Sequence, residues 1–139
     1  MRNRNLSRLS LSLLCLTWLL SACEGPTPVM PEQTWEGTSI DVETRPPRLE
    51  KGMNEFLIIA SKDVKGRSIP VHDLIISLAI NDTGQWQQAI QDGHVGAYRR
   101  AMRVTDPATD VLLVRIEQGN RSGILRFPLN EQHLPSQSQ

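Results

Sequence analysis

Three runs near the end of the chain decide the fold: AYRRAMRVT (97–105), VLLVRIE (111–117) and GILRFPL (123–129). In each run apolar and polar side chains alternate with a period of two, as in a β-strand that buries one face. Such strict alternation over three consecutive runs fits no helix. The hairpin loop between the last two runs is predicted at Gln118–Ser122. The residues predicted to face inward are Tyr98, Met102 and Val104, then Leu112, Val114 and Ile116, then Leu125, Phe127 and Leu129.

Earlier segments repeat this pattern in shorter runs. Residues 38–44 alternate, and the two prolines at 46 and 47 interrupt the run because proline cannot donate to a ladder. Residues 54–61 are apolar on both faces, which predicts a strand that is covered on both sides. Residues 71–80 put Leu74, Ile76, Leu78 and Ile80 on one face. Turns are predicted at 62–67 and 81–84. Residues 85–93 fit either a short strand or a single helical turn.

These runs together predict the fold class. Six or seven short strands, spaced by turn chemistry and without a long helix, are typical of an all-β protein. We therefore expect an antiparallel, immunoglobulin-like β-sandwich over residues 38–130.

The first 22 residues have the features of a targeting segment. Arg2, Arg4 and Arg8 form a basic start, and an apolar stretch of about a dozen residues follows, which suits a signal peptide but is shorter than the roughly 20 residues of a membrane span. The stretch ends in Leu20-Ser21-Ala22-Cys23, which resembles the lipobox of bacterial lipoproteins. The resemblance implies that Cys23 receives diacylglycerol, becomes the first residue of the mature chain and is acylated, with palmitate-type chains holding the protein at a membrane.

The resemblance also implies a location in the cell envelope, facing the periplasm. Glu24 follows the cysteine, and in such lipoproteins Asp at this position commonly signals inner-membrane retention. We therefore favour the outer membrane. An ordinary secretory signal with a chance cysteine at the cleavage site is the alternative.

Composition sets further limits on the mature chain. Residues 23–37 carry three prolines and are predicted to form a lipidated tether, and residues 131–139 form a polar tail that we expect to be disordered.

Removing the signal takes away three of the 15 basic residues. The remaining 12 basic residues and the 15 acidic residues give the mature chain a formal charge of −3. This balance gives no electrostatic case for nucleic-acid binding. Neither Cys15, which leaves with the signal, nor the lipidated Cys23 can form a disulfide, so we expect the domain to be held by its core.

A second resemblance lies at Gly93-His94-Val95-Gly96-Ala97-Tyr98. A turn followed by Gly96-x-Tyr98 at the start of a strand is similar to the tyrosine corner of immunoglobulin-like sandwiches, which implies a buried ring that bonds back to the backbone. The order of Lys51-Gly52, Asp63-Val64-Lys65-Gly66 leading to Pro70, Gly96-x-Tyr98 and a C-terminal hairpin also resembles the YtkA-like and FixH-like envelope domains over residues 38–129. That resemblance implies a role in copper handling or in cytochrome oxidase assembly.

Candidate chemistry is sparse in the chain. Copper(I) prefers soft ligands that converge with histidine, but the segment before Gly96-x-Tyr98 offers only His94, so we expect no metal and no other cofactor. The methionines are expected to serve in packing. No hydrolase elbow, zinc-protease motif or phosphate loop is present, and the acids Asp41 and Glu43 suit a solvated strand face, so we do not expect an enzyme.

The arginines form the most specific predicted surface. If the alternation holds, Arg99, Arg103, Arg115 and Arg126 share the outer face of neighbouring strands, and Arg100 interrupts the apolar face at a sheet edge. A soluble strand face is one interpretation of this set. The other is a docking face for an acidic envelope protein or an anionic glycan, because guanidinium groups bind carboxylates with two hydrogen bonds. The leading expectation is a non-catalytic binding or scaffolding lipoprotein, and the alternative is a copper-delivery or oxidase-assembly accessory.

Overall fold

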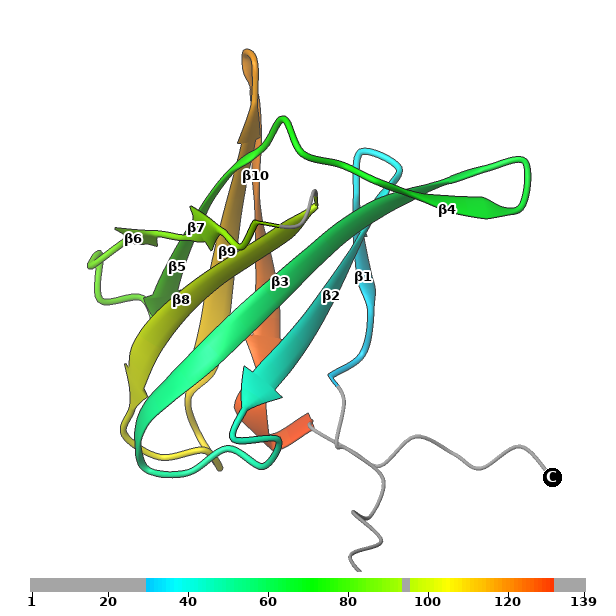
Figure 1. Ribbon diagram of the computed structural model, residues 1–139. Coiled ribbons are helices and arrows are strands. Elements are labelled where there is room, and N and C mark those ends of the chain that lie inside the picture. Colours follow the sequence, from blue (N-terminus) through cyan, green and yellow to red (C-terminus); the bar gives the residue numbers. More distant parts are fainter. Residues whose placement is uncertain (1–29, 94–95, 132–139) are drawn as a thin grey trace, which may run out of the picture.

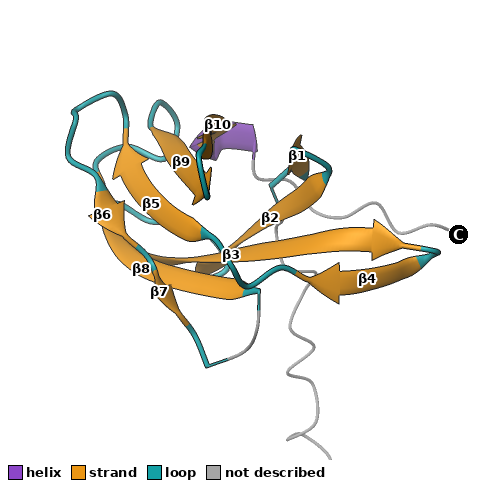
Figure 2. Ribbon diagram, turned by 90° about the horizontal axis from the view of Figure 1, so that it is seen from above, coloured by secondary structure: helices purple, strands orange, loops and turns teal. Residues whose placement is uncertain are grey.

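The computed structural model describes residues 30–93 and 96–131, which form two antiparallel sheets packed face to face (Figures 1 and 2). The first sheet has the order β1 (Gln33–Trp35), β2 (Thr38–Arg45), β3 (Gly52–Val64), β8 (Ala97–Val104) and β7 (Ile90–Gln91), with β4 (Arg67–Pro70) paired to the far part of β3. The second sheet has the order β10 (Arg121–Pro128), β9 (Val111–Gln118), β5 (Ile75–Ile80) and β6 (Gln87–Gln88). A single 3₁₀ turn, Leu129–Glu131, follows β10. The predicted all-β sandwich is confirmed.

The core lies between the inner faces of the two sheets, as the alternation predicts. From the first sheet, Ile40, Phe56 and Ile58 are fully buried, and the second sheet contributes Leu112, Val114, Ile116 and Phe127. Tyr98, Met102 and Val104 of β8 also point inward. Leu125 is only partly buried, whereas Ile124 is exposed as predicted. The predicted two-sided cover of residues 54–61 is wrong, because among residues 30–93 and 96–131 no third layer covers the outer face and Leu57 and Ile59 are only partly buried.

The domain begins earlier than the predicted boundary at residue 38. Residues 33–35, predicted to belong to the tether, form β1 and pair with β2 through the turn at Glu36 and Gly37. Both turn residues have positive φ, as the tight hairpin turn between two twisted strands requires. Met30 and Trp35 are buried in the core, so the residues around β1 are part of the domain.

The ambiguous segment 85–93 forms two very short strands. β6 pairs with β5 in the second sheet, and β7 pairs with β8 in the first. Between them the amide N–H of Ala89 donates to the carbonyl of Ile76 at 2.8 Å. The strand interpretation is therefore correct, and this segment crosses from one sheet to the other.

β3 is the longest strand, and its far end projects from the sandwich. Residues 62–64 pair with β4 through a two-residue turn at Lys65 and Gly66, both with positive φ. The turn predicted over 62–67 is thus much shorter, since most of these residues extend the strands. Figures 1 and 2 show the resulting hairpin reaching past the other strands. We call residues 62–70 the β3–β4 arm.

The opposite end of the sandwich is tied together by Asp110, which is buried. Its carboxylate accepts hydrogen bonds from the backbone N–H groups of Thr105 and Asp106 at 2.7 and 3.0 Å. It also accepts one from the side-chain amide of Asn81 at 2.9 Å. The carbonyl of Asp110 accepts from the N–H of Leu129, so one residue joins the ends of β5, β8 and β10.

Candidate functional site

The four predicted arginines do not share one face. Arg99 and Arg103 lie on β8 in the first sheet, whereas Arg115 and Arg126 lie on β9 and β10 in the second. The outer faces of two packed sheets point in opposite directions, so the predicted single arginine face is wrong. Alternation assigns a residue to one side of its own strand but does not say which sheet that strand joins. Here the loop 105–110 carries the chain from one sheet to the other.

On the first sheet, the arginines of β8 have mainly structural contacts. Arg99 pairs with Asp92 at 3.2 Å and with Glu55 at 4.0 Å. Arg100 is partly buried and donates to the side-chain oxygen of Gln87 at 3.0 and 2.9 Å. Because Gln87 belongs to β6 at the edge of the second sheet, this contact joins the two sheets. Arg103 is exposed and has no ion pair among the described residues.

On the second sheet, the outward residues of β5, β9 and β10 form regular rows. Ser77, Arg115 and Ile124 lie side by side in one row, and Ala79, Leu113 and Arg126 lie in the next. The guanidinium of Arg115 stacks 4.6 Å from the ring centre of Trp86 and lies 3.5 Å from a carboxylate oxygen of Glu117. Ser77, Ala79 and Leu113 are buried although they point away from the core. Side chains on this face therefore cover its centre.

The rim of this face remains open. Ile124 is 54% exposed and Ile75 is 50% exposed. The Arg126 side chain is exposed and makes no ion pair within the described ranges, while its carbonyl accepts a hydrogen bond from the side chain of Gln33 at 2.6 Å. We call this surface the second-sheet face, and its members are Ile75, Trp86, Arg115, Ile124 and Arg126. It offers apolar contact next to the Arg126 guanidinium, which has no counter-ion in the part of the chain that the structure describes.

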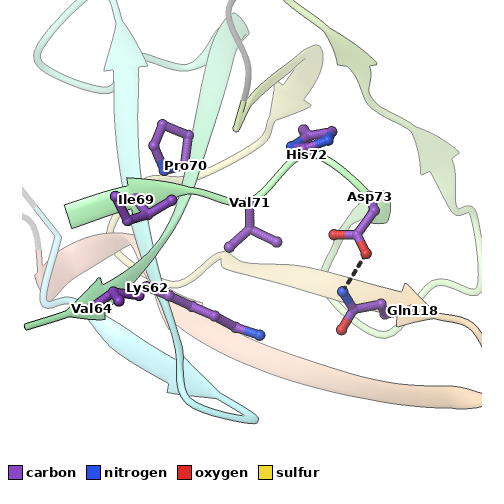
Figure 3. A pocket seen from close by; sticks show the side chains of 8 residues that line it. All are labelled: Lys62, Val64, Ile69, Pro70, Val71, His72, Asp73 and Gln118. Carbon is purple, nitrogen blue, oxygen red and sulfur yellow. Dashed lines mark hydrogen bonds between the residues drawn. The ribbon is translucent and has the colours of Figure 1, made fainter. Parts of the chain in front are cut away.

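A cleft of about 360 Å³ opens at the base of the β3–β4 arm (Figure 3). Four of its eight lining residues are apolar, namely Val64, Ile69, Pro70 and Val71, and the other four are Lys62, His72, Asp73 and Gln118. The amide of Gln118 donates to the Asp73 carboxylate at 2.8 Å, which joins the loop before β5 to the end of β9. This hydrogen bond is the main cause that lowers the pKa of Asp73 below its usual range, and nearby His72 and Lys62 act in the same direction.

Tyr98 is hydrogen-bonded to Val71, one of the residues that line this cleft. Its ring is buried, and its hydroxyl donates to the carbonyl of Val71 at 3.2 Å. The buried ring and its bond to the backbone are as the tyrosine corner implied, but the acceptor lies 27 residues away in the sequence and not within the local turn. Burial raises the pKa of the Tyr98 hydroxyl. The bond ties β8 to the loop between β4 and β5, which lines the cleft.

Gly96 is required by close packing beside Tyr98. Its φ is +85°, and a Cβ there would come within 2.8 Å of both the carbonyl oxygen of Ala60 and the Cβ of Pro70. The same segment is hydrogen-bonded to β3, because the N–H of Ala60 donates to the Gly96 carbonyl at 2.8 Å. The predicted structural role of Gly96 agrees with this geometry.

The described residues contain no cluster of three or more His, Cys, Asp or Glu that could hold a metal. The weak metal candidate His94 and the lipidation site Cys23 lie outside the described residues. Met30 and Met102 pack in the core, whereas Met53 is exposed on the first sheet.

Comparison with known proteins gives no relative. No family model, no curated protein and no solved structure matches the chain. The resemblance to the YtkA-like and FixH-like domains therefore stays a prediction. In the described part of the chain, no helix is long and apolar enough to cross a membrane.

Proposed function

We propose that the protein is a lipid-anchored bacterial envelope protein that acts as a non-catalytic binding or scaffolding module. The sequence Leu20-Ser21-Ala22-Cys23 supports the anchor and the envelope location. The observation that carries the binding role is the second-sheet face. There, the exposed Ile124 on β10 lies directly opposite Arg115, which stacks on Trp86, and two residues before Arg126, which makes no ion pair among the described residues.

This surface resembles protein interfaces in its composition. Tryptophan and arginine are the residue types that contribute most often to binding hot spots, and they do so beside apolar side chains that exclude water. Arg115 is already neutralised by Glu117, whereas Arg126 is available to a partner. A carboxylate on the partner would bind the Arg126 guanidinium through two hydrogen bonds. We therefore propose that the partner is an envelope protein with an acidic surface.

A site-specific photo-crosslinker in living cells tests this proposal. We expect a crosslinking amino acid at Ile124 to trap a partner protein, whereas the same group at Met53 should not. Met53 is a matched control because it is 56% exposed and lies on the outer face of the other sheet. The Arg126→Gln substitution should reduce the adduct at Ile124, and high salt during crosslinking should reduce it as well because it screens exposed charges.

The Arg103→Gln substitution supplies a second control, because Arg103 is also exposed but lies on the first sheet. It should leave the adduct unchanged. No adduct at Ile124, or equal adducts at Ile124 and Met53, would contradict the proposed face. If glycan hydrolases remove the mass that the crosslink adds to the protein, the ligand is an anionic glycan and not a protein.

A further inference from the structure

The β3–β4 arm has one face that mixes apolar and cationic side chains. Lys62 lies directly opposite Ile69, and Val64 lies directly opposite Arg67. Residues that pair directly point to the same side of a two-stranded ribbon, so these four side chains share one face. Val64 is 50% exposed and Ile69 is 45% exposed. Two apolar and two basic side chains therefore alternate across this face.

The exposure of this face follows from the length of β3. The face continues the inner face of the first sheet, where Ile58 and Ala60 are fully buried beneath the second sheet. Beyond Ala60 the second sheet no longer covers β3, although apolar residues continue at Val64 and, on the paired strand, Ile69. Apolar side chains of this size on a projecting hairpin are typical of contact surfaces.

The charges on the arm are distributed unevenly. Asp63 is the one acidic residue between positions 62 and 70. It points to the other face of the ribbon, and its carboxylate accepts the N–H of Gly66 at 3.0 Å in the turn. Lys65 at the tip adds a third cation to Lys62 and Arg67. The apolar face of the arm is therefore positive, although the mature chain as a whole carries more acidic than basic residues.

We propose that the β3–β4 arm docks on an anionic lipid surface and gives the protein a second membrane contact. Val64 and Ile69 would enter the boundary between headgroups and acyl chains, while Lys62, Lys65 and Arg67 would contact lipid phosphates. Lysine and arginine suit this position because their stems pack on apolar groups while their charged ends stay at the headgroups. The hairpin pairing of residues 61–64 with 67–70 already satisfies much of the backbone of the arm, which favours entry into this boundary.

The length of the tether is compatible with this contact, and this step rests on the proposed anchor at Cys23. Seven residues, 23–29, precede Met30, and such a segment spans at most about 25 Å. The tip of the arm at Lys65 lies about 17 Å from Ala60 by the rise of a strand. Ala60 pairs with Ile40, which pairs with Gln33 near the start of the domain. The anchor and the arm can therefore reach the same bilayer when the domain lies on its side.

A polarity-sensitive dye on a cysteine introduced at Val64 tests the proposal. After processing and lipidation at Cys23, this cysteine is the only free thiol in the chain. We would reconstitute the full-length mature lipoprotein into vesicles of phosphatidylcholine, with or without phosphatidylglycerol. The Val64→Cys label should shift to shorter emission wavelengths and be quenched by brominated lipids when phosphatidylglycerol is present. The same label at Met53→Cys should report water in both vesicles.

Charge reversal at the tip provides the matched variant. Lys65→Glu together with Arg67→Glu should remove most of the emission shift at Val64→Cys, because both side chains are exposed cations of the arm. A label that reports water in both kinds of vesicle, or that responds equally at positions 53 and 64, would overturn the proposal and leave the arm as a surface for a protein. Flotation with vesicles of phosphatidylcholine alone reports the lipid anchor separately, because the arm is not expected to bind them. If the protein does not float with these vesicles, the labelled chain mixed with phosphatidylglycerol vesicles still decides whether the arm binds lipid.

Discussion

Tyr98 is the residue that most directly connects the sequence to the structure. The Gly96-x-Tyr98 pattern predicts a buried ring with a bond to the backbone, and both features are present. The identity of its acceptor, Val71, could not be predicted because the bond spans 27 residues and depends on where β4 ends. Local motifs constrain local conformation, whereas a distant partner is fixed by the assembled sheets.

Substitutions at Tyr98 should separate its hydrogen bond from its packing. Tyr98→Phe keeps the ring and removes the bond to Val71, so the free energy of unfolding should fall by about 0.5–1.5 kcal/mol. Tyr98→Ala leaves a cavity in the core and should cost about 3–5 kcal/mol. Urea denaturation of the three proteins measures both differences. Equal stability of all three would mean that Tyr98 is not a core residue.

Asp110 should make the stability of the domain depend on pH. Burial raises the pKa of its carboxyl, but the hydrogen bonds from the Asp106 backbone, the Asn81 amide and the Thr105 backbone outweigh burial and hold the pKa below the ordinary value of 3.8. A lowered folded-state pKa means that the ionised group stabilises the fold above the unfolded-state pKa. That stabilisation is lost as the pH falls through the folded-state pKa.

The Asp110→Asn variant should therefore be less stable than the wild type at neutral pH, by about 1–3 kcal/mol, because an amide N–H would face backbone donors. Its free energy of unfolding should also fall less than that of the wild type between about pH 5 and pH 2. Asp106→Asn is the control, since Asp106 is exposed. Parallel pH profiles of wild type and Asp110→Asn would show that Asp110 does not contribute this dependence.

At the scale of elements, alternation was enough to place most strands but not to assign them to sheets. The runs at 97–105, 111–117 and 123–129 correspond to β8, β9 and β10. Their inward residues are correct because burial of one face imposes the period of two. The arginine face failed because β8 and β9 follow each other in the chain yet lie in different sheets. The loop 105–110 carries no pattern that marks this change.

β1 was missed because it is three residues long and lies beside a proline-rich segment. The available signals were the apolar Met30 and Trp35 and the Glu36-Gly37 pair, which suits a hairpin turn. The arm was missed as well. The alternation of β3 continues through Lys62 and Val64, but a glycine-containing turn nearby favours a loop interpretation.

The packing of β1 against β10 can be tested at Gly123. A Cβ at this position would collide with the indole of Trp35, so Gly123→Ala should destabilise the domain by about 1–3 kcal/mol. Ser122→Ala at the neighbouring exposed position should change stability by less than about 0.5 kcal/mol. Thermal unfolding of both variants measures the difference. A neutral Gly123→Ala variant would indicate that β1 is not held against β10 in solution.

At the scale of the whole molecule, the sandwich separates three surfaces with different chemistry. The first sheet carries ion-paired Arg99, the second sheet carries the Trp86–Arg115 stack, and the arm carries exposed apolar residues beside cations. In our account the lipid on Cys23 holds the protein at the membrane, the arm sets its orientation, and the second-sheet face binds a partner. The sequence predicts the sandwich, which the structure confirms, whereas the anchor stays a prediction. The separation of surfaces depends on how the strands are divided between the sheets.

The anchor is the central claim, and replacement of Cys23 tests it most directly. The measurement is metabolic labelling of the protein in cells with a clickable palmitate analogue, together with the mass of the chain. We predict that the wild type is labelled and begins at residue 23, whereas Cys23→Ala is unlabelled and keeps its signal segment, because the lipoprotein peptidase requires the modified cysteine. A Cys23→Ala protein that is still cut before residue 23 and stays bound to the membrane would contradict the account.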